Sequence, residues 1–192
     1  MKIDFKKMDN LIPVIAQDNI SKRVLMLGYM NNEAYEKTLA DGFVTFWSRS
    51  KGRLWQKGET SGNKLKVVSM NMDCDGDTLL VMARPLGPTC HTGETSCFGN
   101  GFGVGDLFKL LEDRKDKMPK GSYTSSLFEG GLKAILAKVE EESEEVVRAA
   151  RSEGKQRLME ESCDLFYHMF VLLINEDIDL GDIEEELSGR NG

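Results

Sequence analysis

The stretch EDRKDKMPKGS, residues 112–122, divides the 192-residue sequence into two parts of different character. It is charged, contains Pro119 and Gly121, and has almost no apolar side chains, which is typical of a linker between domains. Short alternating segments and glycine-rich turns precede it, whereas two long periodic segments follow it. We therefore expect two domains, residues 1–112 and 122–192, joined by a linker at residues 113–121.

The second domain is predicted to be all-helical. In residues 132–150 and again in residues 157–174, apolar side chains recur at about 100° per residue, the period of an amphipathic helix. These side chains are Leu132, Ile135, Leu136, Val139, Val146, Val147 and Ala150 in the first segment and Leu158, Leu165, Met169 and Leu172 in the second. Packing of the two stripes would form a helical bundle.

Each predicted helix carries two acidic side chains at the spacing i, i+3, along the margin of its apolar stripe. Acidic side chains on a helix usually form a solvated face, but the matching geometry on both helices favours four carboxylates that meet at the seam and need cations. They are Glu142, Glu145, Glu161 and Asp164. We interpret His168 as a packing residue paired with Asp164 and leave it out of this site.

In the first domain, the stretch MDCDGDTLL, residues 72–80, surrounds Cys74 with three aspartates. An EF-hand is excluded, because Thr78 stands where that loop needs glycine. The alternating segments on both sides predict two strands. If the alternation continues, Asp73, Asp75 and Asp77 share one face and suit Mg²⁺, whereas the thiol lies on the other face and suits zinc. The alternative is an acidic turn with Cys74 as a small core residue.

The next loop, GPTCHTGETSCFGNG at residues 87–101, adds Cys90, His91 and Cys97. The N-terminus lacks the apolar core of a secretory signal, and no run of residues approaches the length of a membrane span. We therefore expect a cytoplasmic protein, in which clustered cysteines favour a metal over disulfides. Three thiolates with a free fourth position match catalytic zinc, and three thiolates with His91 match structural zinc, so both alternatives stay open.

The composition narrows the classes of partner. A net charge of -7 and a pI near 5.0 argue against a nucleic-acid partner, which a basic surface would attract. With 40% hydrophobic residues, long disordered segments are not expected.

Several motifs of the first domain resemble the phosphoribosyl-AMP cyclohydrolase family. They are VLMLGYMNNEAYEKTL, FWSRSKGRLWQKGETSGN, DCDGDTLLV and CHTGETSCF. The motifs SYTSSLFEGG, KVEEESEEV and ESCDLFYH of the second domain resemble the phosphoribosyl-ATP pyrophosphohydrolases, although Glu140 and Ser143 stand where that family usually has small apolar residues. Together the two halves resemble the bifunctional enzymes of histidine biosynthesis.

The resemblance implies a fold and a set of ligands. The first domain would be a small α+β pseudo-barrel that forms a homodimer, and the second an all-α bundle of the nucleotide pyrophosphohydrolase type. The resemblance also implies Mg²⁺ at Asp73, Asp75 and Asp77 of the first domain and at Glu142, Glu145, Glu161 and Asp164 of the second. It implies zinc held by Cys74 together with Cys90 and Cys97 of the partner subunit. It favours the catalytic interpretation of zinc.

The resemblance also implies hydrolysis in two steps. The second domain would convert phosphoribosyl-ATP to phosphoribosyl-AMP and pyrophosphate, and the first would open the purine ring of phosphoribosyl-AMP with zinc-activated water. His91 would shuttle the proton; the alternative roles are a fourth zinc ligand and a hydrogen bond within the loop. Candidate phosphate contacts are Arg49, Lys51, Lys57 and Ser61, and the alternative for this stretch is a basic hairpin turn without a binding role.

Two other classes of function remain open at this stage. A non-catalytic zinc-binding module would not explain the second acidic cluster, and a general nucleoside triphosphate pyrophosphatase would leave the cysteine loop without a role. Neither would open a purine ring.

Overall fold

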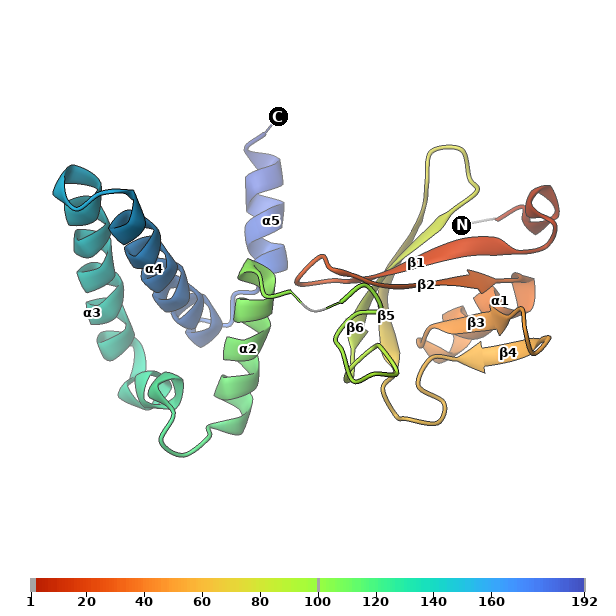
Figure 1. The fold of residues 1–192 in the computed structure, drawn as a ribbon, viewed down its shortest axis with the longest axis horizontal. Coiled ribbons are helices and arrows are strands. Elements are labelled where there is room, and N and C mark those ends of the chain that lie inside the picture. The colour runs from red at the N-terminus through yellow and green to blue at the C-terminus, as the bar shows by residue number, and fades with distance from the viewer. Residues whose placement is uncertain (1–2, 100, 192) are drawn as a thin grey trace. The chain divides into compact units, whose positions relative to one another are not determined.

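The computed structural model describes residues 3–99 and 101–191 and consists of two compact units (Figure 1). The first unit ends at Gly101 and the second begins at Phe102. Strands β1 to β6 all belong to the first unit, and the second unit is helical. The predicted pairing of an α+β domain with an all-α domain is therefore confirmed.

The first unit contains a mixed four-stranded sheet with the order β2-β1-β6-β5. Strand β1 pairs with β2 in antiparallel and with β6 in parallel orientation, and β5 and β6 are antiparallel neighbours. Buried and half-buried residues alternate along β1 and β6, so the buried face forms the core. The strands are β1 (Ile12–Asp18), β2 (Val24–Met30), β5 (Leu65–Met72) and β6 (Leu79–Pro85).

A second, two-stranded sheet of β3 (Thr45–Ser48) and β4 (Arg53–Gln56) continues from the edge of β5. The N–H of Val44 donates to the carbonyl of Leu65 at 3.0 Å. At the other end of the main sheet, β2 approaches β3 so closely that a methyl group at Gly28 would lie 2.3 Å from Phe46. The strands thus surround the core as expected for a pseudo-barrel.

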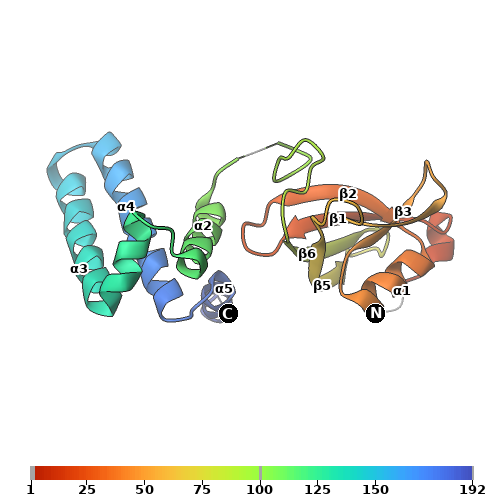
Figure 2. The ribbon, with the colours of Figure 1, turned by 90° about the horizontal axis from the view of Figure 1, so that it is seen from below.

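Helix α1 (Asn32–Asp41) lies along one side of these strands (Figure 2). Asn31 begins it by accepting a hydrogen bond from the N–H of Ala34 at 2.9 Å, and Gly42 ends it in the left-handed conformation. Ala34 and Tyr35 on its inner face are buried in the core of the first unit.

The second unit contains helices α2 (Val104–Lys117), α3 (Tyr123–Ser152), α4 (Lys155–Asn175) and α5 (Leu180–Gly189). Helices α3 and α4 lie side by side, as Figures 1 and 2 both show. They include the two helices that the sequence predicts. Gly131, with φ of 66° and ψ of -171°, breaks α3 between its first two turns and its long remainder.

The predicted linker at residues 113–121 is wrong for its first half. Helix α2 runs through Lys117, and only the turn before Tyr123 separates it from α3. The helix forms because Phe108 and Leu111 are buried, and because Phe108 packs edge-on against Phe170 of α4 at 5.3 Å. The domain boundary therefore lies at Gly101, before α2, and not at residue 112.

Candidate active sites

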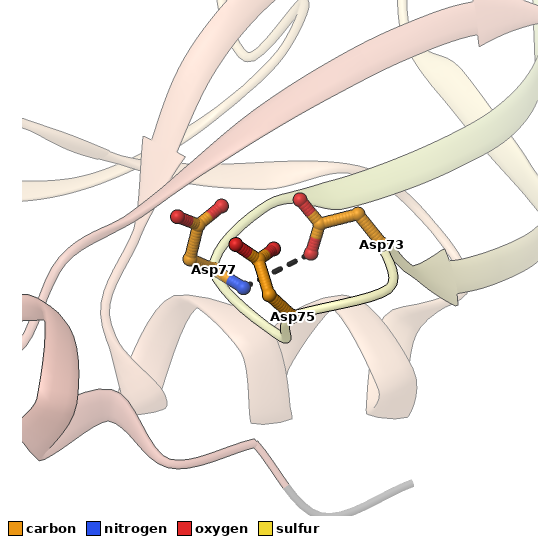
Figure 3. Close-up of side chains that lie close together, drawn as sticks. All are labelled: Asp73, Asp75 and Asp77. Carbon is orange, nitrogen blue, oxygen red and sulfur yellow. Dashed lines mark hydrogen bonds between the residues drawn. The ribbon is translucent and has the colours of Figure 1, made fainter.

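The aspartate motif forms a tight turn that connects β5 to β6 (Figure 3). One carboxylate oxygen of Asp73 accepts hydrogen bonds from the N–H groups of Gly76, Asp77 and Thr78 at 3.1, 3.0 and 3.0 Å. The bond from Thr78 contributes most to lowering the pKa of Asp73. Carboxylate oxygens of Asp73, Asp75 and Asp77 lie within 4.8 Å of one another, on the same side of the turn. Such a set of oxygens suits a hard cation.

The predicted continuation of strand alternation through this motif is wrong. The β5–β6 ladder ends at the pair Met72 and Leu79, and Gly76 adopts φ of 77° in the turn between them. The alternative of a core residue at Cys74 is also wrong, because this thiol is exposed. The turn itself gathers the three carboxylates, and Cys74 does not belong to their group.

A cavity of about 430 Å³ lies between the loop after β4 and the cysteine loop that follows β6. Five of the predicted site residues line it: Lys57, Ser61, Cys90, His91 and Cys97. The remaining two candidates for phosphate binding are not in its lining. Arg49 places its guanidinium 3.7 Å above the ring of Tyr29, and Lys51 is exposed in the turn between β3 and β4.

The two thiols of this cavity differ in their surroundings. The hydroxyl of Thr92 donates to the sulfur of Cys90 at 3.1 Å, and this bond lowers the pKa of Cys90. Burial raises the pKa of Cys97. Lys57 is only 7% exposed and donates to the carbonyl of Asn63 at 3.2 Å. Burial lowers the pKa of Lys57, and both thiols oppose this shift, so a cation and two sulfurs share one pocket.

His91 is exposed beside this pair, with its Nδ1 3.8 Å from the sulfur of Cys90. Within the described residues, the three predicted zinc ligands do not form a group of ligand atoms within 4.8 Å of one another. One chain thus brings Cys90 and Cys97 together in the pocket and leaves Cys74 outside that arrangement.

The second unit contains the other carboxylate group. Oxygens of Glu142, Glu161 and Asp164 lie within 4.8 Å of one another, and Glu142 and Glu161 are only 8% and 2% exposed. Burial raises the pKa of Glu161, and Arg157, which forms an ion pair with it, opposes the rise. Three of the four predicted ligands are therefore together. Glu145 lies outside the group, where its carboxylate forms an ion pair with Arg148.

His168 belongs beside this group, although the sequence interpretation left it out. It is 4% exposed, and its Nε2 lies 3.7 Å from an oxygen of Glu142, not in the expected pair with Asp164. The rings of Tyr123 and Tyr167 stand edge-on to it at 6.0 and 5.1 Å. Burial lowers the pKa of His168. Its position seven residues after Glu161, on the same helical face, is the signal that could have placed it.

Two family models match the two units. Residues 26–99 match the model described as phosphoribosyl-AMP cyclohydrolase, and residues 104–191 match the model described as phosphoribosyl-ATP pyrophosphohydrolase. The second match begins where α2 begins, which agrees with the boundary at Gly101. The aspartate turn and the cysteine cavity thus lie in the first match, and the buried carboxylates lie in the second.

Whole proteins match as well. The chain is 50% identical over 196 residues to the histidine biosynthesis bifunctional protein HisIE of Bacteroides thetaiotaomicron, covering 100% of this chain and 97% of that protein. It is 52% identical over 191 residues to HisIE of Xanthomonas campestris, covering 98% and 93%. The chain belongs to the HisIE family. As a HisIE protein, it is a bifunctional hydrolase of histidine biosynthesis.

The order of the HisIE domains assigns each activity to a unit. The first unit is the phosphoribosyl-AMP cyclohydrolase, and the second is the phosphoribosyl-ATP pyrophosphohydrolase. The substrates of the protein are nucleotides of the histidine pathway. None of the helices in the described part of the chain has the length and apolar character needed to cross a membrane.

Proposed function

We propose that the pyrophosphohydrolase unit binds Mg²⁺ between α3 and α4 through Glu142, Glu161 and Asp164. The observation that carries this proposal is the approach of three carboxylates within 4.8 Å, two of them almost fully buried. Like charges this close repel one another, and burial makes the repulsion stronger. Arg157 pairs with Glu161, yet the pKa of Glu161 remains raised, so a divalent cation would favour ionisation of all three carboxylates. Glu145 would become a fourth ligand if its carboxylate left the ion pair with Arg148 and bound the metal.

For the cyclohydrolase unit, we propose zinc at Cys90 and Cys97, completed by Cys74 of a second copy in a homodimer. The proposal is supported by the pairing of two thiols beside Lys57 in the cavity and by the position of Cys74 outside that pair. The three aspartates of the β5–β6 turn offer oxygen ligands only, and we propose a separate Mg²⁺ site there.

The chain's own residues have distinct roles in this proposal. His91 lines the cavity next to Cys90, where it would accept or return the proton of the attacking water. Lys57 and Ser61 line the cavity and would contact the substrate phosphate, with Arg49 and Lys51 contributing from the neighbouring hairpin. When bound, zinc lowers the pKa of a water molecule and Mg²⁺ neutralises phosphate charge. We place the protein in the cytoplasm, where free thiols persist.

Two substitutions in the cyclohydrolase unit test whether its metal sites are separate. Cys90→Ser should remove zinc and ring opening together, whereas Asp75→Asn should keep zinc and lose ring opening, with partial rescue at high Mg²⁺. Zinc content is measured by elemental analysis, and pyrophosphate release serves as the internal control because it should persist in both variants. Equal loss of zinc from both variants would mean one mixed site.

Subunit complementation tests the proposed zinc site between two copies. Cys74→Ser and Cys90→Ser chains should each be inactive in ring opening. After exchange of subunits, half of the dimers combine both chains, and each such dimer has one intact site of two, so about a quarter of the wild-type rate should return. A mixture of tagged chains that co-purify but stay inactive would contradict the shared site.

For the pyrophosphohydrolase unit, Asp164→Asn should abolish pyrophosphate release and leave the opening of supplied phosphoribosyl-AMP intact. Glu144→Gln is the matched control, because Glu144 is exposed on α3 and lies outside the carboxylate group. Equal rates for Asp164→Asn and Glu144→Gln would contradict the proposed Mg²⁺ site.

A further inference from the structure

Tyr123 and Lys138 are fifteen positions apart in α3, yet both lie beside the Glu142 carboxylate. In an uninterrupted helix such a separation would span about 22 Å, at 1.5 Å per residue. Gly131 breaks α3 between the two positions. The ammonium of Lys138 lies 3.2 Å from an oxygen of Glu142, and the ring of His168, whose Nε2 lies 3.7 Å from the same oxygen, meets the ring of Tyr123 edge-on at 6.0 Å. The fold thus brings a cation and a phenol together beside the carboxylate group.

Contacts of its ring hold Tyr123 in place, although much of the side chain is exposed to solvent. The ring lies nearly parallel to that of Tyr167, with centroids 6.3 Å apart and an angle of 22° between the planes. It meets His168 edge-on, yet it remains 53% exposed. Tyr167 is in turn fixed by a hydrogen bond of 2.6 Å between its hydroxyl and that of Thr124. The exposed ring of Tyr123 is therefore held by contacts with two neighbouring rings.

Lys138 is bound to the edge of the carboxylate group. Its ammonium lies 2.6 Å from an oxygen of Glu141 and 3.2 Å from an oxygen of Glu142, one of the three grouped carboxylates. Its side chain is 27% exposed, whereas the other two basic residues that pair with acids of this region, Arg148 and Arg157, are 54% and 46% exposed. Of these three cations, Lys138 is the one most enclosed by the site.

The charges of the site pose a problem for its substrate. Three carboxylates face a triphosphate chain that is itself strongly anionic, and a bound divalent ion offsets only part of this repulsion. A positively charged donor at the rim is therefore needed. A lysine ammonium suits this role because it is a compact charge with three donors on a flexible stem.

We propose that Lys138 and the Tyr123 hydroxyl form a subsite for the polyphosphate chain of the substrate, next to the carboxylate group of Glu142, Glu161 and Asp164. This inference rests on the Mg²⁺ site proposed above. When a metal ion binds the Glu142 carboxylate, that carboxylate becomes a weaker partner for Lys138, and the ammonium turns to a phosphate oxygen. The exposed phenol donates a second hydrogen bond.

This role predicts opposite effects on the two ligands. Lys138→Met removes a positive charge beside the metal ligands, so binding of a divalent ion without substrate should stay equal or become tighter. Binding of a polyphosphate should weaken, because a charge-assisted hydrogen bond is lost. A lysine that served only to orient Glu142 would give a different pattern, with weaker metal binding and an equal loss for the polyphosphate.

The test uses the full chain with Mn²⁺ and inorganic tripolyphosphate as probes. Mn²⁺ binding is followed by electron paramagnetic resonance, with Asp164→Asn defining the ions bound elsewhere. Tripolyphosphate binding is measured by calorimetry at saturating Mg²⁺. Lys138→Met should reduce tripolyphosphate affinity on the order of tenfold to a hundredfold and leave Mn²⁺ binding unweakened. Tyr123→Phe, which keeps the ring, should reduce tripolyphosphate affinity by about three- to tenfold.

Lys133→Met is the matched control, because Lys133 is an exposed lysine of the same helix, and it should behave like the wild type. The inference is overturned if Lys138→Met and Lys133→Met bind tripolyphosphate equally, or if Lys138→Met weakens Mn²⁺ and tripolyphosphate by the same factor. Failure of the Mg²⁺ site itself would look different, because the wild type would then bind no more Mn²⁺ than Asp164→Asn does.

Discussion

The substitution Phe108→Ala tests whether α2 belongs to the pyrophosphohydrolase unit. Phe108 is 1% exposed and packs edge-on against Phe170 of α4, with ring centroids 5.3 Å apart. Truncation of a buried phenylalanine to alanine costs about 3–5 kcal/mol, because the transfer free energy is lost and a cavity remains. A unit of about 90 residues has a total stability of about 5–14 kcal/mol, so the loss is a large fraction of it.

In a unit of this size, each kcal/mol lowers the unfolding midpoint by about 4–8 °C. Phe108→Ala should therefore lower the midpoint of the second unit by at least about 12 °C. The assay follows the two activities of the full chain separately after heating, with phosphoribosyl-ATP supplied for one and phosphoribosyl-AMP for the other. Pyrophosphate release should fail at the lower temperature, and ring opening should keep its wild-type midpoint.

Phe46→Ala is the matched control in the first unit. Phe46 is likewise 1% exposed and stacks on Trp55 at 5.7 Å, so its truncation should lower the midpoint of ring opening alone. The reasoning is refuted if Phe108→Ala lowers the midpoint of ring opening and spares pyrophosphate release. That result would return α2 to the first domain, where the charged segment after residue 112 first suggested it belonged.

Three further outcomes are expected. Gly28→Ala should destabilise the cyclohydrolase unit by about 1–3 kcal/mol in calorimetry, because the new methyl group would lie 2.3 Å from Phe46. Glu161→Gln should raise the unfolding midpoint of the second unit in EDTA, since it removes one of three crowded charges, and should abolish stabilisation by Mg²⁺; a lower midpoint in EDTA would contradict this. Burial lowers the pKa of His168, so in EDTA this histidine makes the second unit less stable as the pH falls below about 6.5, whereas the raised pKa of Glu161 acts in the opposite direction. The change in unfolding free energy from pH 7 to pH 5, measured by urea titration, should therefore be more favourable for His168→Phe than for the wild type, and equal changes would contradict this.

The strand pattern around the aspartate motif was readable from the sequence, but the shape of the motif was not. The alternation of apolar and polar side chains predicts two strands, which are β5 and β6 in the structure, because each has one face toward the core. Between them the chain must reverse, and Gly76 supplies the positive φ that makes a tight turn possible. Three hydrogen bonds to Asp73 then fix the turn. Hydrogen bonds within the turn, and not the two-residue period of a strand, therefore decide where these carboxylates point.

The boundary between the units could not be placed from composition, because α2 has two unlike ends. Its first turns supply Phe108 and Leu111 to the core of the second unit, and its last turns are charged and look like a linker. Arg114 donates to Thr124 at 2.8 Å, and Lys115 donates to the carbonyl of Ile174 at 2.5 Å. These charges hold the end of the helix to its own unit, a role that only the folded arrangement reveals.

Helices α3 and α4 were predicted correctly, but the prediction of which of their side chains are buried was partly wrong. The sequence pattern assigns Leu132, Leu136 and Val147 to a buried stripe, yet these side chains are 42%, 41% and 47% exposed, while Glu142 and Glu161 are buried. Burial of a carboxylate is costly unless a cation compensates it, and exposure of three large apolar side chains forgoes their hydrophobic gain. Both costs fall if a cation occupies the carboxylate group and a second copy of the chain covers the exposed stripe. The Mg²⁺ site and the homodimer proposed above would account for these two features of α3.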